Sequence, residues 1–235
     1  MAKTLLLGFG EVGKAVFELL KDAHEIDYTS LEEDKTTRPI EDNEVLLIAI
    51  PYSDKFRTIV RDYQEKTNAK ATIIFSSVPV GTCKSLNAVH SPVEGRHPHL
   101  AESMKFMKRW VGGYNKLASQ FFWNAGIKVM QVPEAAFTEF LKLRSTSLYG
   151  LNIEFARYSQ EVANKLKMPF EFTRDYDKDY NELYEELELG QFHRYILDAP
   201  AGNIGGHCVV PNAKLLDEDY PSVFLKEIYK EKEDK

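Results

Sequence analysis

A glycine-rich turn near the N-terminus, Gly8-Phe9-Gly10-Glu11-Val12-Gly13, has the spacing GxGxxG. In this spacing the first glycine permits a tight turn and the second lets a pyrophosphate approach the backbone, while the third lets a helix pack closely on a strand. A helix that begins here would present its N–H groups and the positive end of its dipole to the phosphates. The turn therefore predicts a dinucleotide site formed by residues 8–13, the alternative being a glycine turn without a ligand.

The residues expected near the ribose of such a dinucleotide leave the choice of cofactor open. The expected second strand ends in two hydroxyl residues, Thr29 and Ser30. Two carboxylates (Glu32, Glu33) and then two cations (Lys35, Arg38) come after them. A carboxylate favours the ribose hydroxyls of NAD, whereas a hydroxyl tolerates the 2′-phosphate of NADP. We expect NAD or NADP, with Ser30, and Pro51 after the third strand, among its contacts.

The segments that would position the turn alternate between strands and helices. Lys3–Leu7 is a continuous apolar run, as buried parallel strands are, and apolar residues at helical spacing follow it from Val12 to Ala23. Further strands are expected at Glu25–Thr29, Val45–Ile50, Thr72–Ser76, Trp110–Val111 and Lys128–Val132, with a helix at Asp54–Lys66. This alternation predicts an α/β fold, a Rossmann-like doubly wound parallel sheet, over residues 1–132.

The pattern changes after Pro133. Apolar residues at helical spacing from Glu134 to about Lys167 predict one long connecting helix, which Pro169 ends. An acidic helical stretch (177–192), a glycine-rich loop (201–206) and a helical C-terminus follow. Residues 133–235 are therefore expected to form a helical domain for substrate binding and dimerisation.

Composition narrows the class of protein. The 235 residues carry 30 basic and 36 acidic side chains, a net charge of −6, so nucleic acid is not an expected partner. No apolar run approaches the roughly 18–20 residues that cross a bilayer, and neither a membrane partner nor a metal site is predicted. The two cysteines, Cys83 and Cys208, are expected to be free thiols in a soluble, cytoplasmic protein.

Three stretches resemble the UDP-glucose/GDP-mannose dehydrogenase family, NAD-dependent enzymes that oxidise nucleotide-sugar alcohols to acids. Ser76–Thr82 (SSVPVGT) looks like the family's STVPVGT segment, and Ala201–Cys208 (AGNIGGHC) looks like its GPGxGGHC loop. Between them, Trp110–Gly113 and Pro133–Lys142 follow the family's order of strand, helix, strand and long helix. The resemblance spans most of residues 1–216 and implies a homodimer paired through the long helix.

The resemblance also implies roles for individual residues. Cys208 matches the cysteine that forms a thiohemiacetal and then a thioester, and Lys142 matches a lysine that polarises the reacting oxygen. Ser77 stands at a threonine that holds a water near the cofactor, and Glu94 resembles a glutamate that activates water for hydrolysis. Asn203, Gly205 and His207, together with Lys142, would contact the substrate.

The chain also departs from the family's pattern. Thr146 replaces an asparagine four residues after Lys142, and Asn212 replaces an aspartate among the catalytic positions. An amide cannot exchange a proton as an aspartate does. The chain lacks the family's C-terminal nucleotide-binding domain, so relative to the family it is expected to be a truncated form.

Three functions are compatible with these residues. The first is an NAD(P)-dependent oxidoreductase acting on a primary alcohol of a sugar or nucleotide sugar, in which the Cys208 thioester would carry the product to the acid. The second is a two-electron dehydrogenase like the hydroxyacid and prephenate enzymes, with Cys208 only lining the pocket. The third is a dinucleotide-binding module without catalysis. We expect a small-molecule substrate and an enzyme.

Overall fold

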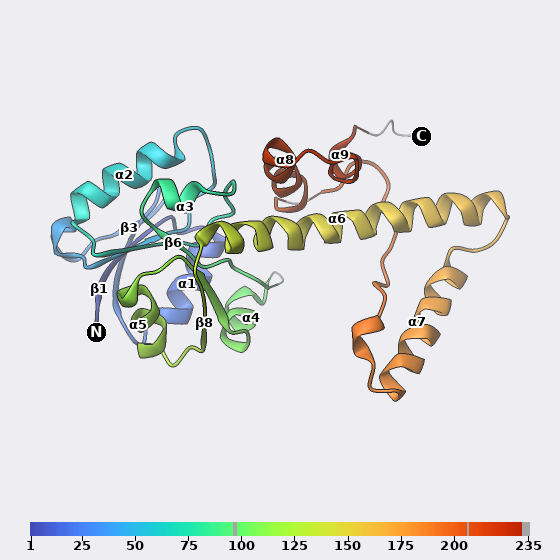
Figure 1. Cartoon of the computed structure of the whole chain (residues 1–235), viewed down its shortest axis with the longest axis horizontal. Coiled ribbons are helices and arrows are strands. Elements are labelled where there is room, and N and C mark those ends of the chain that lie inside the picture. Colours follow the sequence, from blue (N-terminus) through green and yellow to red (C-terminus); the bar gives the residue numbers. More distant parts are fainter. Residues whose placement is uncertain (96–97, 206, 232–235) are drawn as a thin grey trace. The chain divides into compact units, whose positions relative to one another are not determined.

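The computed structural model describes residues 1–95, 98–205 and 207–231 (Figure 1). Its contacts divide the chain into two compact units, Met1–Leu143 and Arg144–Lys235. Helix α6 (Ala135–Lys165) begins in the first unit and ends in the second. The first unit combines a sheet with helices, and the second is helical.

In the part of the chain that the structure describes, the first unit contains one eight-stranded sheet with the order β3-β2-β1-β4-β5-β6-β7-β8. The strands are β1 (Lys3–Leu7), β2 (Glu25–Thr29), β3 (Asp34–Lys35), β4 (Val45–Ile48), β5 (Ala71–Ile74), β6 (Val89–His90), β7 (Arg109–Gly112) and β8 (Val129–Val132). Neighbouring strands are parallel except that β3 pairs antiparallel with β2 and β6 pairs antiparallel with β7. The expected α/β fold with a mostly parallel sheet is confirmed.

Helices cover both faces of this sheet (Figure 1). On one face lie α1 (Glu11–Leu20), α4 (Leu100–Phe106) and α5 (Lys116–Asn124), and on the other α2 (Phe56–Thr67) and the short α3 (Thr82–Ser85). Successive strand residues point to opposite faces, so Leu6 packs under α1 while Leu5 packs under α2. Because both faces are covered, the central strands are apolar without alternation.

The structure adds elements that the sequence pattern did not predict. These are the two-residue strands β3 and β6, helices α3 and α4, and a 3₁₀ turn at Ile40–Asp42, whereas α5 lies where the family resemblance implies a helix between two strands. The third expected strand ends at Ile48 rather than Ile50. Ala49 still donates its N–H to the Leu7 carbonyl at 2.8 Å, and its carbonyl packs against Gly8 of the glycine turn. β6 escapes a period-based search because it has only two residues and ends in a polar side chain, His90.

The long helix is confirmed: it runs for 31 residues, close to the expected 134–167. In the second unit it is joined by α7 (Glu171–Glu186), a 3₁₀ turn (Gly190–Phe192), α8 (Val209–Asp219) and α9 (Val223–Tyr229). α8 and α9 pack on the helix at Gly150, where an added Cβ would lie 2.7 Å from Val209 Cγ1 and 2.9 Å from Ile228 Cγ2. A larger residue than glycine would push these two helices off α6.

No helix among the described residues is long and apolar enough to cross a membrane. Within the same residues, no three His, Cys, Asp or Glu side chains gather as a metal site would require.

Candidate functional site

The glycine turn lies at the carboxyl end of β1, the strand from which the sheet extends in both directions to β2 and β4. The three glycines have different roles. A Cβ on Gly8 (φ 97°) would lie 2.5 Å from the Ala49 carbonyl oxygen, and one on Gly13 would lie 2.0 Å from the Gly8 carbonyl oxygen. A Cβ on Gly10 would meet nothing within 4 Å. Packing therefore requires the first and third glycines, while the second leaves its backbone accessible to a ligand.

The other residues of the turn frame this opening. Phe9 stacks on Tyr28 with ring centroids 3.6 Å apart, so its side chain belongs to the protein core. Val12 is half-buried against the same core, and Glu11 lies in the exposed first turn of α1. What the turn can offer a pyrophosphate is thus its backbone and the N-terminus of α1. The open backbone at Gly10 and the N-terminus of α1 therefore fit the pyrophosphate of a dinucleotide.

The residues beyond β2 form a compact turn stabilised by Ser30. The Ser30 hydroxyl accepts the Glu33 N–H at 2.9 Å and donates to the Glu33 carbonyl at 2.9 Å, and the Thr29 hydroxyl donates to Asp34 at 3.3 Å. Carboxylates therefore surround the end of β2.

Arg38, the nearest arginine in sequence to this turn, is held by other carboxylates. Its Nε donates to Asp27 at 3.1 Å and its Nη1 to Glu25 at 3.0 Å. Burial alone would raise the pKa of Asp27, but hydrogen bonds from Thr37 and Arg38 outweigh it and lower that pKa. The Arg38 charge is therefore already balanced within the protein.

Lys142 and Glu94 lie together at the carboxyl edge of the sheet. The Lys142 Nζ donates to the Val93 carbonyl at 2.5 Å and lies 3.8 Å from Glu94 Oε2, with side-chain exposures of 14% and 29%. Ser77 is half-buried directly after Ser76, whose hydroxyl donates to the Ile50 carbonyl at 2.6 Å. Pro51, next to Ile50, is exposed. An ammonium and a carboxylate this close suit proton transfer at a substrate oxygen.

Two buried side chains of α6 that the sequence analysis did not single out fix the loops around Lys142. The Glu139 carboxylate accepts the N–H groups of Gly81 (2.5 Å) and Cys83 (2.7 Å), which fastens the SSVPVGT loop to the helix. Burial, followed by the Glu139 charge, raises the pKa of the Cys83 thiol well above its ordinary value. Thr138 contacts His90, Oγ1 to Nδ1, at 3.0 Å.

His90 connects this helix to the strand that precedes Ser77. Its Nε2 lies 3.2 Å from the Ser76 carbonyl oxygen, which only accepts, so Nε2 carries the proton and Nδ1 accepts from Thr138. Complete burial lowers the pKa of His90 to about 4. Near neutral pH His90 is therefore neutral. It links α6 to the Ser76 backbone by hydrogen bonds and does not act as a general acid.

Arg109 on β7 adds a buried positive charge to the first unit. It is 1% exposed, and its Nε and Nη1 have no hydrogen-bond partner among the described residues. Burial lowers the pKa of Arg109, and the charge of Glu94 acts in the opposite direction. Its charge thus acts on the same carboxylate as that of Lys142.

The predicted residues of the glycine-rich loop lie in the second unit. Cys208 and His207 are exposed at the start of α8, and Asn203 and Gly205 are exposed in the loop before it. Gly206 lies outside the described residues. Asn212 is 3% exposed, and its Nδ2 donates to the Thr146 hydroxyl at 3.0 Å. The two positions at which the chain departs from the family's pattern are therefore hydrogen-bonded to each other.

A third residue of α6, also absent from the sequence analysis, holds this loop. Arg157 donates to the carbonyls of Pro200 (2.8 Å) and Gly202 (2.7 Å) and pairs with Glu154 at 2.7 Å. No sequence signal singled it out, because its face of α6 carries Thr146, Gly150 and Glu154 and no apolar stripe. The partners themselves are distant in sequence and leave no local pattern.

Comparison with known proteins gives a clear result for the fold. No protein-family model and no curated protein matches the sequence. The UDP-D-ManNAc dehydrogenase of Pyrococcus horikoshii matches 96% of the chain with a TM-score of 0.73 at 18% identity, and the chain spans 66% of that protein's length.

Two further solved structures match the fold of the chain over most of its length. The UDP-glucose dehydrogenase of Pyrobaculum islandicum matches 97% of the chain with a TM-score of 0.68 at 15% identity, and the chain spans 67% of its length. The 3-hydroxyisobutyrate dehydrogenase of Mycobacterium tuberculosis matches 97% of the chain with a TM-score of 0.68 at 12% identity, and here the chain spans 91% of the length. The chain therefore has the fold shared by nucleotide-sugar dehydrogenases and a hydroxy-acid dehydrogenase.

Proposed function

We propose that this protein is a nicotinamide-dinucleotide-dependent dehydrogenase that oxidises an alcohol group of a sugar, a nucleotide sugar or a related small hydroxy compound. The observation that carries the proposal is the difference in packing among the three glycines of the turn. Gly8 and Gly13 serve packing, whereas Gly10 alone keeps open the approach to the N-terminus of α1. When bound, the nicotinamide would supply the acceptor for the hydrogen and electron pair that leave the alcohol carbon.

We propose NAD rather than NADP as the cofactor. Glu32, Glu33 and Asp34 follow the end of β2, and carboxylates there would accept hydrogen bonds from ribose hydroxyls and repel a 2′-phosphate. Arg38, which a 2′-phosphate would need, is engaged with Asp27 and Glu25.

The first-unit residues are proposed to serve the alcohol oxidation. The Lys142 Nζ would hydrogen-bond the reacting oxygen and stabilise its developing negative charge. Glu94, 3.8 Å from that nitrogen, would receive the proton and pass it to water. Ser77 would hold a water with its hydroxyl, in a loop that Glu139 fixes through Gly81 and Cys83.

Cys208 is proposed to serve a second oxidation. Its sulfur would bond to the aldehyde carbon while the proton moves to the aldehyde oxygen, which gives a thiohemiacetal. Loss of a hydride from that carbon to a second oxidised dinucleotide, with loss of the hydroxyl proton to solvent, would give a thioester, and attack by water would release the acid and restore the thiol. Asn203, Gly205 and His207, in the loop before Cys208, would contact the substrate.

A second candidate is a two-electron dehydrogenase that stops after the first oxidation. The neutral Thr146–Asn212 pair favours it, because neither side chain can exchange the proton that thioester hydrolysis requires. In this case Cys208 would only line the pocket.

We also propose that the protein is a homodimer. The second unit exposes large apolar side chains along α6 and α9, including Phe155 (68%), Tyr158 (61%) and Phe224 (68%). Monomeric proteins seldom leave such side chains in water together. Light scattering at micromolar concentration should give twice the chain mass, with Phe155→Arg shifting it toward the monomer; a monomer mass for the wild type overturns the proposal.

The stoichiometry of cofactor reduction tests the proposed reaction. The protein is mixed with NAD or NADP and a panel of UDP-sugars, GDP-sugars and small hydroxy acids, and reduced cofactor is measured by its absorbance. A ratio of two reduced cofactors per substrate supports the route through Cys208, and a ratio of one that Cys208→Ala leaves unchanged supports the two-electron candidate. Lys142→Met should slow either reaction by about 10²-fold or more. Tight NAD binding without turnover of any substrate would instead favour a binding module.

A further inference from the structure

One face of α6 in the second unit contacts the chain on both sides of Cys208. This face carries Thr146, Gly150, Glu154 and Arg157, which are spaced four, four and three residues apart and therefore share one side of the helix.

The contacts after Cys208 are made by the first two of these residues. The Thr146 hydroxyl accepts from Asn212 at 3.0 Å, and Gly150 lets Val209 pack directly on the helix backbone. Cys208 immediately precedes Val209, the first residue of α8. Its C-terminal neighbours are therefore fixed.

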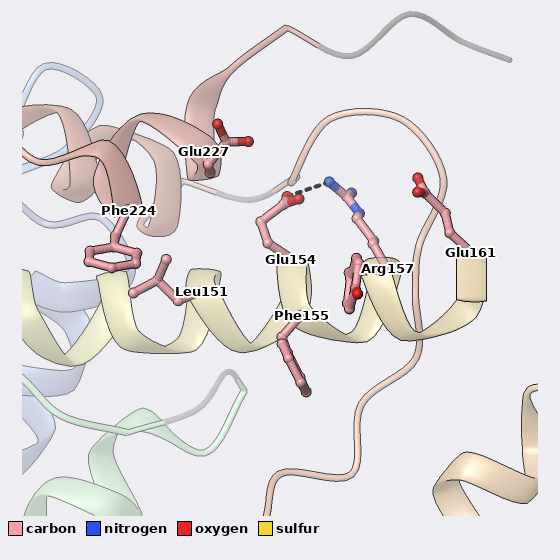
Figure 2. A pocket seen from close by; sticks show the side chains of 8 residues that line it. Leu151, Glu154, Phe155, Arg157, Glu161, Phe224 and Glu227 are labelled. Atoms are coloured by element: carbon pink, nitrogen blue, oxygen red, sulfur yellow. Dashed lines mark hydrogen bonds and ion pairs between the residues drawn. The ribbon is translucent and has the colours of Figure 1, made fainter. Parts of the chain in front are cut away.

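The contacts before Cys208 are made by Arg157. Its Nε donates to the Pro200 carbonyl at 2.8 Å, its Nη2 to the Gly202 carbonyl at 2.7 Å and its Nη1 to Glu154 at 2.7 Å. Arg157 and Glu154 side chains are only 11% and 12% exposed. Figure 2 shows the two side chains meeting on one side of α6. They are among the residues that line a hollow of about 350 Å³ between α6 and α9. Little water therefore competes for these hydrogen bonds.

The loop needs such an anchor because of its composition. Gly202 has a positive φ of 70°, and Gly205 has open space around its Cα, so the loop backbone has many conformations available. Among the loop residues that the structure describes, Ile204 is the one buried apolar side chain. Two carbonyls bound by one rigid guanidinium remove most of this freedom at the start of the loop.

We infer that Arg157 is the positioning residue of the Cys208 loop: its guanidinium holds the Pro200 and Gly202 carbonyls, and Glu154 holds the guanidinium. The inference rests on the proposed function in one respect, the use of Cys208 in catalysis. A lysine cannot replace Arg157, since one ammonium does not reproduce three directed hydrogen bonds in a plane.

Hydrogen exchange of the loop tests the anchor without cofactor or substrate. In Arg157→Gln the amides of residues 201–205 should exchange about tenfold faster or more, and Arg157→Lys should recover only part of the protection. The double variant Glu154→Arg/Arg157→Glu restores an ion pair but places no donor on the two carbonyls, so its loop should exchange as fast as that of Arg157→Gln. Arg194→Gln is the matched control. It removes an ion pair between Arg194 and Asp177 (3.0 Å) that does not involve the loop, so the exchange rates of the loop amides should stay unchanged.

Thermal unfolding is measured on each variant first, so that only folded variants enter the comparison. If Arg157→Gln does not fold, the double variant and Arg157→Lys decide. Unchanged loop exchange in Arg157→Gln overturns the inference, because the two carbonyls would then not need the guanidinium. Full protection in the double variant also overturns it, because an ion pair between positions 154 and 157 would then be enough to order the loop.

Turnover tests the link to Cys208. Arg157→Gln should lower kcat for acid formation about 10- to 100-fold with little change in KM. In a Cys208→Ala background, which forms no acid, it should leave the rate of the first cofactor reduction unchanged. An equal loss of activity in both backgrounds overturns the link to the cysteine. If the wild type forms no acid, the proposed role of Cys208 fails, while the exchange measurement still decides whether Arg157 anchors the loop.

Discussion

The side-chain amide of Asn212 donates a hydrogen bond to the hydroxyl of Thr146 at 3.0 Å, although the two residues are 66 positions apart. Asn212 is 3% exposed and begins the second turn of α8, while Thr146 lies one turn beyond Lys142 on α6. Both positions depart from the family pattern that the sequence resembles, and the departures form one neutral, hydrogen-bonded pair. Such a pair can hold α8 against α6, but neither side chain can act as a general acid or base near neutral pH.

Asn212→Asp should therefore restore a titratable group to the site. We expect the pH profile of kcat to gain an ionisation that the wild type lacks, and the release of acid to become faster. Burying the new carboxylate should cost about 1–3 kcal/mol of stability near neutral pH. Asn152→Asp on α6, where the Asn152 amide donates to the Leu148 carbonyl of its own helix at 2.8 Å, is the matched control. Identical pH profiles for the wild type and Asn212→Asp would contradict the expectation.

His90 should make the protein sensitive to acid. Its pKa is about 4 in the fold, because of burial, against about 6.5 in an unfolded chain, so the unfolded state binds the proton more readily. The stabilising contribution is complete above pH 6.5 and is lost as the pH falls toward 4, by about 3 kcal/mol. Urea unfolding across this range should show a smaller loss in His90→Gln than in the wild type. The exposed His99→Gln should behave like the wild type, and an unaltered pH dependence in His90→Gln would rule out this role.

The two thiols should differ strongly in reactivity. Cys208 is exposed, whereas Cys83 is buried and its pKa is raised by burial and by Glu139. Thiolates are the reactive form, so iodoacetamide should modify Cys208 in the native protein and Cys83 only after unfolding. Peptide mass spectrometry gives both rates in one experiment, with Cys83→Ala as the control. Equal modification of the two cysteines before unfolding would show that the SSVPVGT loop opens readily and that Glu139 does not fasten it.

The sequence predicted the parts of the fold that local pattern determines. β1 has the expected bounds because an apolar run followed by a glycine turn is typical of a parallel strand covered on both faces. β2 also has the expected bounds. The long helix was predictable for a similar reason, since apolar residues at helical spacing continue across it without a proline until Pro169.

The remaining features depend on contacts between distant residues. Glu139 reaches Gly81 across 58 positions, and Arg157 reaches Pro200 across 43. Neither contact leaves a periodic signal, because each is one side chain satisfying backbone groups of a loop. The antiparallel pairing of β6 with β7 likewise depends on a single register, His90 opposite Gly112.

The most direct test of the account is calorimetric titration of the wild type and Gly10→Val with NAD and NADP. Valine at position 10 meets no protein atom within 4 Å of its Cβ, so the variant should fold normally while its side chain blocks the approach of a pyrophosphate. Gly13→Ala, whose Cβ would lie 2.0 Å from the Gly8 carbonyl oxygen, is the contrasting variant and should lose stability. The account predicts that the wild type binds NAD, binds NADP more weakly, and that Gly10→Val binds neither. Equal binding by the wild type and Gly10→Val, or no binding of either cofactor to the wild type, would contradict it.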